Sequence, residues 1–383
     1  MPHKSQINMT DSIDKHCNSN KSCDYILKMS KHKPISDLLR AEIETGKYAS
    51  DRRLPSEEAL CRRWKVSRPT VARALRVLQL EGLIERRVGS GTFVRAEIKP
   101  LQTLLGLLVD GLGKTEILDP ICAEITRAAQ QRNCSVLTGG LPTERRPAEL
   151  AMQWAAGGVR GVVFAPLENI ENREAFNLEV VKSFRRANIA VVLVDRDTTD
   201  FPLRSDCDLV AMDNFHAGYE LGLHLAAIGS QRIAFMARPA YPSSTDQRLA
   251  GLTESLRRSG LATPEFLVSE PENPEFVRRL KFNSGAYDAC VCSNDMTAAR
   301  LLQTAQTSGY QVPRDFRLAG FDDVGFASLL SVPLTTIRQP CRAIGVACID
   351  TLLGRLAHPE LPPRAILLRG ELILRDSTKM TRN

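Results

Sequence analysis

The spacing of apolar residues separates a short helical region near the N-terminus from a longer region in which strands and helices alternate. Residues 34–46 carry apolar side chains three and four positions apart and end at Gly46, which predicts an amphipathic helix. A second helix is expected to open within 54–58, where Ser56 can serve as the N-cap. A third is expected to begin near Ser67 and run to about residue 80, with an apolar stripe of Val71, Ala74, Leu75 and Leu78.

Two short extended segments follow these helices, at 83–87 and 92–95. The Gly-rich sequence 88–91 between them predicts a β-hairpin. Three short helices and a hairpin make a winged helix-turn-helix. Arg73 and Arg76 project from the side of the third helix that is opposite its apolar stripe. Such a helix fits the major groove of DNA, where an arginine can reach the acceptor atoms of guanine.

From residue 101 onward, apolar runs of strand length alternate with helical patterns. Strands are expected at 104–110, 135–138, 161–165, 190–195, 209–213, 233–237, 286–293 and 316–322. Helices are expected near 120–132, 147–156, 173–186, 215–228, 246–259, 296–308 and 343–356. This alternation predicts an α/β fold of doubly wound parallel sheets with helices on both faces. The region is longer than one such sheet usually needs, so we expect a body of two lobes.

The charge of the chain is concentrated near its N-terminus. The 383 residues are 43% apolar and 25% charged, which is typical of a globular protein. Residues 31–97 hold 15 Lys and Arg against 9 Asp and Glu, whereas residues 98–383 hold 32 of each kind. Nearly all of the net charge of +7 therefore lies in the predicted winged helix-turn-helix. A small basic module on a neutral body indicates a head that binds a polyanion, with a solvated basic face as the alternative.

Other classes of protein find less support in the sequence. No stretch approaches the roughly 18 uninterrupted apolar residues of a membrane helix, and the N-terminus lacks the apolar segment of a secretory signal. We therefore expect a cytoplasmic protein that is not inserted in a membrane, with its ten cysteines reduced. We expect no metal and no cofactor, since Cys290 and Cys292 have the wrong spacing for a zinc knuckle. Residues 111–114 lack the full spacing of a phosphate-binding loop, and no catalytic residue is assigned.

The segment 54–94 carries a more specific pattern. Its pieces LPSE, VSRPTV, EGLI and GSGTFV resemble the DNA-binding domain of the GntR family of bacterial regulators. The resemblance implies that Arg68 and Thr70 contact operator DNA and that Gly89 lies at the tip of the wing. Many members carry arginine directly after the T-V pair, where this chain has Ala72, and whether Arg73 takes over that contact stays open. The candidate DNA-binding residues are Ser67, Arg68, Pro69, Thr70, Arg73 and Gly89.

Polar side chains recur where the predicted strands of the body end. They include Asp110, Asp195–Arg196, Asp213–Asn214, Asn294–Asp295 and Asp322–Asp323. Ligands of open α/β sheets bind beyond the carboxyl ends of the strands, and carboxylates and amides suit the hydroxyl groups of a sugar-like molecule. For any single one of these residues, capping of the following helix explains its presence about as well.

The same strand ends carry a second resemblance. VVLVDR, VAMDN, RLAG, CSND, LAGFDD and VPLTTI occur between residues 191 and 337, and with them the body resembles the effector domain of the LacI/GalR repressors. That resemblance implies a periplasmic-binding-protein-like fold with effector contacts at Asp195, Arg248, Asn294 and Asp322. Arg196 and the loop 110–113 are weaker candidates.

The combined interpretation is a sequence-specific transcriptional regulator, expected to be a repressor and a homodimer. We expect a disordered tail (1–30), a head that binds double-stranded operator DNA (31–97), a linker (98–102), a body that binds a small sugar-like effector (103–376) and a tail (377–383). Three alternatives remain: a DNA-binding protein whose body only dimerises, a cytoplasmic sugar-binding protein, and an enzyme.

Overall fold

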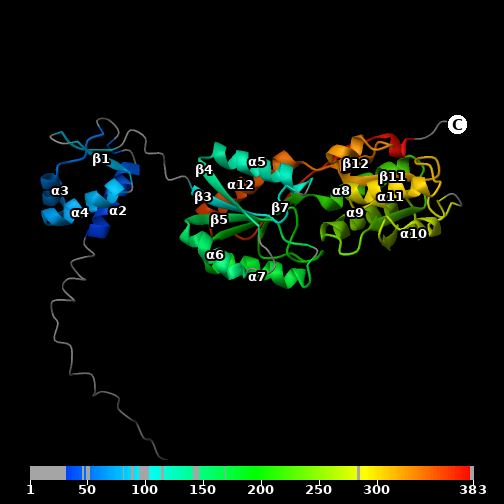
Figure 1. Ribbon diagram of the computed structural model, residues 1–383, viewed down its shortest axis with the longest axis horizontal. Coiled ribbons are helices and arrows are strands. Elements are labelled where there is room, and N and C mark those ends of the chain that lie inside the picture. The colour runs from blue at the N-terminus through cyan, green and yellow to red at the C-terminus, as the bar shows by residue number, and fades with distance from the viewer. Residues whose placement is uncertain are drawn as a thin grey trace, which may run out of the picture. The chain divides into compact units, whose positions relative to one another are not determined.

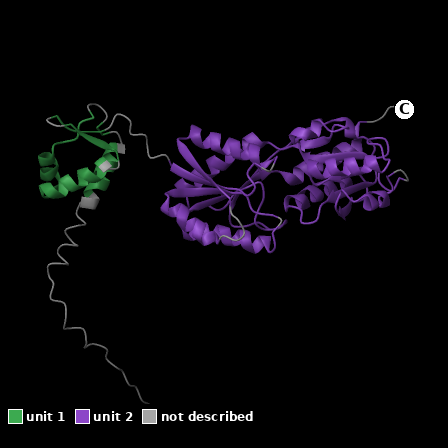
Figure 2. Ribbon diagram, in the orientation of Figure 1, with its two compact units in different colours: residues 1–101 green, residues 102–383 purple. Residues whose placement is uncertain are grey.

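The computed structural model of the chain is shown in Figure 1. It describes residues 32–44, 47–48, 52–80, 82–87, 90–94, 103–113, 116–140, 146–168, 170–282 and 285–379. The chain divides into two compact units, Met1–Leu101 and Gln102–Asn383 (Figure 2). The predicted disordered tail and linker lie outside the described residues, as does Gly89.

The first unit, called the head here, has the predicted three helices and hairpin. The helices are α2 (His32–Glu44), α3 (Glu57–Trp64) and α4 (Arg68–Leu80). Strands β1 (Ile84–Arg87) and β2 (Gly91–Val94) pair antiparallel, with Arg87 opposite Gly91 at the end near the turn. The predicted stripe of α4 is buried in the core of the head, where it packs with Leu39 and Leu60.

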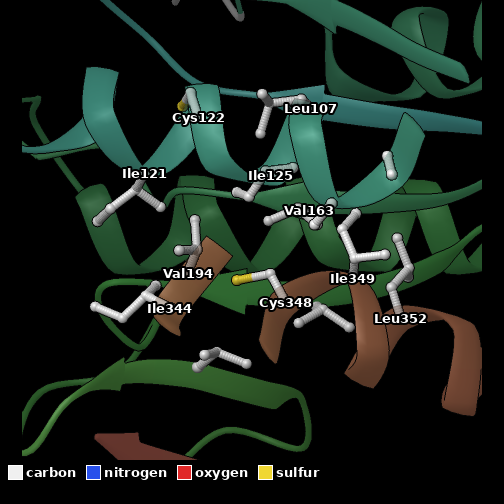
Figure 3. Close-up of a cluster of buried hydrophobic side chains, with 14 of the residues drawn as sticks. Leu107, Ile121, Cys122, Ile125, Val163, Val194, Ile344, Cys348, Ile349 and Leu352 are labelled. Atoms are coloured by element: carbon white, nitrogen blue, oxygen red, sulfur yellow. The ribbon is translucent and has the colours of Figure 1, made fainter. Parts of the chain in front are cut away.

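The second unit, called the body, begins with a lobe built on a six-stranded parallel sheet, the N-lobe. Its strand order is β13-β7-β6-β5-β3-β4. The strands are β3 (Thr103–Leu108), β4 (Cys134–Gly139), β5 (Val159–Phe164), β6 (Ala190–Val194), β7 (Asp208–Met212) and β13 (Ala365–Leu368). Helices α5 (Leu118–Gln131) and α12 (Cys341–Ala357) cover one face, and α6 (Pro147–Ala156) and α7 (Arg173–Arg186) cover the other. Figure 3 shows the core that α5 and α12 share, to which Cys122, Ile125, Cys348 and Ile349 all contribute side chains.

The other lobe, the C-lobe, has a second six-stranded sheet in the order β14-β12-β11-β10-β8-β9. The strands are β8 (Ile233–Ala237), β9 (Glu265–Val268), β10 (Ala289–Cys292), β11 (Arg317–Asp322), β12 (Thr335–Arg338) and β14 (Glu371–Ile373). Helices α8 (Asn214–Ala227) and α9 (Ser244–Arg258) cover one face, and α10 (Pro274–Arg279) and α11 (Asp295–Thr307) cover the other. Two short 3-10 helices, η2 (Gly325–Ser328) and η3 (Asp376–Thr378), complete the lobe.

The chain passes between the lobes three times. It crosses from β7 to α8, returns from β12 to α12, and crosses again from β13 to β14. We call these passages the crossovers. They bring the carboxyl ends of strands from both sheets toward the junction of the lobes, which is where the predicted effector residues lie.

The two-lobed α/β fold is confirmed, with two corrections. We expected parallel sheets, but β14 pairs antiparallel with β12. We also ended the body at residue 376, whereas Ser377 and Thr378 are buried, and the Ser377 hydroxyl donates to the Leu318 carbonyl oxygen at 2.6 Å. These two residues therefore belong to the body, because their side chains complete its packing beside β11 and β12.

Candidate functional sites

The helix-turn-helix of the head is held by local polar contacts at its turn. The Ser56 hydroxyl accepts a hydrogen bond from the backbone N–H of Ala59 at 3.2 Å, which caps α3 as expected. Lys65 ends α3 in the left-handed conformation, with φ of 51°. At the start of α4, the hydroxyls of Ser67 and Thr70 lie 2.8 Å apart. This turn fixes the direction of α4 and the position of its first residues.

The predicted DNA-binding residues of α4 lie at its exposed beginning and along its outer face. The Arg68 side chain is 81% exposed, and its Nε lies 3.2 Å from a carboxylate oxygen of Glu57. Pro69 and Arg73 are exposed, and Thr70 is half-buried. Since Val71, Ala74, Leu75 and Leu78 of α4 are packed into the core, Arg68 and Arg73 lie on the solvent-exposed part of the helix.

The hairpin and the segment before α3 add arginines that sequence reasoning missed. Arg53, Arg86 and Arg87 line the same surface hollow as Arg68. Arg86 pairs with Glu57 at 2.9 Å, and the Arg87 guanidinium lies 5.0 Å from the centre of the Phe93 ring. The dipeptide Arg86–Arg87 at the end of a predicted strand was the available signal. Glu57 and Glu58 line the hollow as well, and Glu57 pairs with both Arg68 and Arg86. Because these arginines are exposed, unlike the buried arginines of the body, they can exchange a carboxylate partner for a phosphate of a nucleic acid.

The predicted effector residues all line one cavity of about 630 Å³ in the body. These residues are Asp195, Arg196, Arg248, Asn294 and Asp322. They come from the ends of β6, β10 and β11 and from helix α9. Glu168, which follows β5, also lines the cavity and was missed. From the weaker loop candidate, Gly113 donates its backbone N–H to Asp119 at 2.8 Å, while the cavity is lined by the next segment, Glu116–Leu118.

The N-lobe side of the cavity contains an arginine between two carboxylates. The Nε of Arg196 donates to Asp195 Oδ2 at 2.9 Å, and its Nη1 lies 3.0 Å from Glu168 Oε2. Burial raises the pKa of Glu168, and the attraction of Arg196 opposes that rise. The three side chains form a fixed polar wall, because each charge is held by the next.

The C-lobe side is organised by Arg248, which is 5% exposed. Its Nε donates to Asn214 Oδ1 at 2.8 Å, its Nη1 to the Ser293 carbonyl oxygen at 2.5 Å and its Nη2 to Asp322 Oδ1 at 3.1 Å. The guanidinium carbon also lies 4.7 Å from the centre of the Phe321 ring. Arg248 thus contacts three segments of the C-lobe, and its orientation is set before any ligand binds.

Close packing of α8 on α9 places Arg248 beside these partners. A Cβ atom added to Gly218 of α8 would lie 1.9 Å from the Arg248 carbonyl oxygen, and one added to Gly251 of α9 would lie 1.9 Å from that of Phe215. Only glycine allows the two helix backbones to approach this closely. The sequence analysis predicted Arg248 but not Gly218 and Gly251, the two glycines that let α9 bring Arg248 to its partners.

Asp322 ends β11 with a positive φ of 113°. Burial raises its pKa to about 6, although Arg248 acts in the opposite direction. The buried carboxyl of Asp295 secures the loop that follows, since its oxygens accept from the Val324 N–H at 3.1 Å and the Thr336 hydroxyl at 2.6 Å. The end of β11 is therefore fixed in position, and Asp322 lines the cavity there. It does not cap a helix.

Asn294 fits both interpretations offered by the sequence. Its side-chain oxygen accepts from the Thr297 N–H at 2.8 Å and caps α11, while the residue also lines the cavity. Asp213, in contrast, caps α8 through the His216 N–H at 2.9 Å. Among the residues that the structure describes, no three His, Cys, Asp or Glu side chains gather as a metal site, and no helix is long and apolar enough to span a bilayer.

Comparison with known proteins defines the class. Residues 31–94 match the model of bacterial regulatory proteins of the gntR family, and residues 223–378 match that of the periplasmic binding protein-like domain. The chain therefore combines a GntR-type DNA-binding domain with a periplasmic-binding-protein-like body, which confirms both resemblances seen in the sequence.

Among particular relatives, the chain is 27% identical over 368 residues to the arabinose metabolism transcriptional repressor of Geobacillus stearothermophilus. The match covers 92% of this chain and 98% of the relative. The predicted function class, a DNA-binding transcriptional regulator, is supported by this match together with the gntR-type head.

Solved structures share the fold of the body. A LacI family transcriptional regulator from Enterococcus faecium with bound ribose has a TM-score of 0.59 at 19% identity, covering 73% of this chain and 100% of the other. The lac repressor dimer bound to operator and the anti-inducer ONPF has a TM-score of 0.60 at 23% identity, covering 73% and 95%.

Proposed function

We propose that this protein is a transcriptional repressor that binds its operator as a homodimer and releases it when a neutral sugar-like molecule occupies the body cavity. The observation that carries the proposal is the convergence of all five predicted effector residues on one cavity. The arabinose repressor and the ribose-bound regulator supply the sugar class by analogy. The proposal implies a cytoplasmic protein that is not an enzyme, because a repressor acts by binding operator DNA.

The polar groups of the cavity favour hydroxyls over charged ligand groups. Arg196 and Arg248 are already paired with carboxylates, so neither is a free cation for a phosphate or carboxylate ligand. A guanidinium has five N–H groups, and the three described bonds of Arg248 leave others that can donate to a hydroxyl. Glu168 and Asp322 supply acceptors nearby. Apolar surface from Ile117, Tyr241 and Phe326 suits the C–H face of a sugar ring.

The head supports operator recognition by a pair of subunits. In this proposal, Arg68, Thr70 and Arg73 meet base edges or phosphates in the major groove, and the hairpin arginines meet the backbone. Ser67 and Pro69 set the geometry of the helix start. One recognition helix covers a short half-site, so specific binding requires two heads related by a two-fold axis. The lac repressor structure is a dimer on its operator, which supports this arrangement by analogy.

Calorimetric titration of the full chain tests the effector. The panel is L-arabinose, D-ribose, D-xylose and cellobiose, together with the anionic D-galacturonate and D-ribose 5-phosphate. We expect one or more neutral sugars to bind, with no binding of the anionic compounds, and the Arg248→Ala variant to lose the signal. Fluorescence anisotropy with DNA from upstream of the gene then tests release. A protein that binds DNA but none of the panel would support a body that only dimerises.

A further inference from the structure

Gln339 lies on the crossover between β12 and α12, at the passage from the C-lobe back to the N-lobe. The residue is 4% exposed. It directly follows Arg338, the last residue of β12, and only Pro340 separates it from α12. No sequence pattern singled it out, and it is not one of the predicted effector residues.

Two hydrogen bonds connect Gln339 to the acidic residues on opposite sides of the cavity. Its Nε2 donates to Asp195 Oδ1 at 2.9 Å, and this carboxylate belongs to the N-lobe. Its backbone N–H donates to the carbonyl oxygen of Asp322 at 3.3 Å, and that residue ends a C-lobe strand. A single residue on a crossover therefore contacts one cavity residue from each lobe.

The remaining polar atom of the side chain is the amide oxygen, which these two hydrogen bonds do not use. Gln339 Oε1 is buried and receives no hydrogen bond from the part of the chain that the structure describes. A buried acceptor without a donor raises the free energy of the arrangement that contains it. An arrangement of the lobes in which a group donates a hydrogen bond to Gln339 Oε1 therefore has a lower free energy. The same holds for a bound hydroxyl that donates to this oxygen.

We propose that Gln339 is a positioning residue that couples effector binding to the arrangement of the two lobes. The inference rests on the proposed function, since it takes the effector to bind at Asp195 and Asp322. A ligand hydroxyl that donates to Asp195 shares this carboxylate with Gln339, so the hydrogen bond between them changes with occupancy. The change passes directly to the crossover, which connects the lobes. An effector shifts the lobe equilibrium only by its difference in affinity for the two arrangements, and Gln339 supplies part of that difference.

The first test compares Gln339→Leu with the parent and with Gln306→Leu. Gln306 is an exposed glutamine of the C-lobe that accepts from the Ser331 hydroxyl at 3.0 Å, far in sequence from the crossovers. For each protein, the operator dissociation constant is measured with and without saturating sugar from the panel, and the sugar dissociation constant is measured without DNA. We expect Gln339→Leu to lower the operator response at least tenfold while the sugar dissociation constant changes less than tenfold. Gln306→Leu should leave both quantities unchanged.

A full operator response in Gln339→Leu at saturating sugar would overturn the proposal, even if the sugar bound more weakly. Should Gln339→Leu fail to fold, Gln339→Met replaces it, because methionine keeps a flexible unbranched chain without the amide. Loss of the operator response with normal sugar binding cannot come from a simple contact to the ligand, which would raise the sugar dissociation constant and leave the saturated response intact.

A second measurement needs no ligand. Non-thiol spin labels carried by unnatural amino acids replace Met152 of the N-lobe, 70% exposed, and Leu329 of the C-lobe, 82% exposed. Pulsed electron resonance gives the distance distribution between them. We expect Gln339→Leu to shift or broaden the distribution in sugar-free protein and Gln306→Leu to leave it unchanged. An unchanged distribution in Gln339→Leu contradicts the inference. If no sugar binds, the proposed function fails, while this measurement still decides the role of Gln339.

Discussion

Replacing Asp322 with asparagine should change how the stability of the body depends on pH. The Asp322 side chain is 14% exposed, and burial raises its pKa from 3.8 to about 6 against the attraction of Arg248. Because the pKa is higher in the folded chain than in the unfolded one, the folded protein binds more protons between these values. The contribution of Asp322 to the stability of the folded chain is therefore present below about pH 4 and is lost as the pH rises through 6.

The magnitude follows from the size of the shift. A rise of about two pKa units corresponds to about 3 kcal/mol, since one unit is 1.36 kcal/mol. Asparagine has nearly the same shape and does not titrate. About 0.5 kcal/mol of this contribution is already lost at pH 4, so the free energy of unfolding of Asp322→Asn, minus that of the parent, should increase by about 2.5 kcal/mol between pH 4 and pH 7.5. The variant gains relative stability as the pH rises, because the parent must then bury an ionised carboxylate.

Urea unfolding followed by circular dichroism at half-unit pH intervals measures this difference. Asp350→Asn is the control, because Asp350 is an exposed carboxylate of the same body, paired with Arg132 at 2.6 Å. The control corrects for the general effect of removing one negative charge. Subtracting the parent curve cancels the other groups that titrate in this range. If the difference between Asp322→Asn and the parent stays constant across the interval, the buried carboxylate is not the cause and the reasoning is refuted.

Four further outcomes are expected. In a gel-shift titration, Arg68→Ala should lose about 1–3 kcal/mol of operator-binding free energy while its melting temperature stays unchanged. If this variant binds the operator as tightly as the parent, Arg68 does not contact the bases. Footprinting should reveal two half-sites related by inversion and light scattering a dimer, whereas a monomer on a single half-site would contradict the two-fold arrangement. Arg248→Ala and Asp322→Ala should bind operator normally yet fail to release it with sugar, and a normal release curve for both would overturn the cavity assignment. Gly218→Ala should lower both sugar affinity and melting temperature because its Cβ would meet the α9 backbone, while Gly354→Ala, whose nearest atom is a flexible arginine nitrogen at 3.6 Å, should change neither.

The sequence was most informative where a buried strand ended in a charged residue. Asp195 and Asp322 follow continuous apolar runs, so their place at the edge of a sheet could be predicted from the pattern. Glu168 was not predicted as a cavity residue because Pro166 and Leu167 separate it from the predicted strand. Gln339 was not predicted because the strand before it, β12, is short and contains two threonines, so it lacks a continuous apolar run. Asn294 could not be decided by sequence, since one amide oxygen can cap a helix while the residue still faces a cavity.

Three of the strands that the sequence did not predict share a physical cause. Strands β9, β13 and β14 lie at the edges of their sheets and are largely exposed or half-buried, so they lack the continuous apolar runs of central strands. The pairing of β13 is moreover decided by a partner far away in the chain, since it joins β7. The tight approach of α8 and α9 depends on which glycines face each other, and helical periodicity alone does not specify that pairing.

The three crossovers have a consequence for the synthesis of the protein. The N-lobe begins at β3, yet its helix α12 and edge strand β13 are encoded after nearly all of the C-lobe. The C-lobe in turn needs β14 and the buried residues Ser377 and Thr378. A ribosome must therefore release almost the whole chain before either lobe can close its sheet. A stop codon anywhere upstream of residue 365 leaves both lobes incomplete, and only the head can fold early, as an independent unit at the front of the nascent chain.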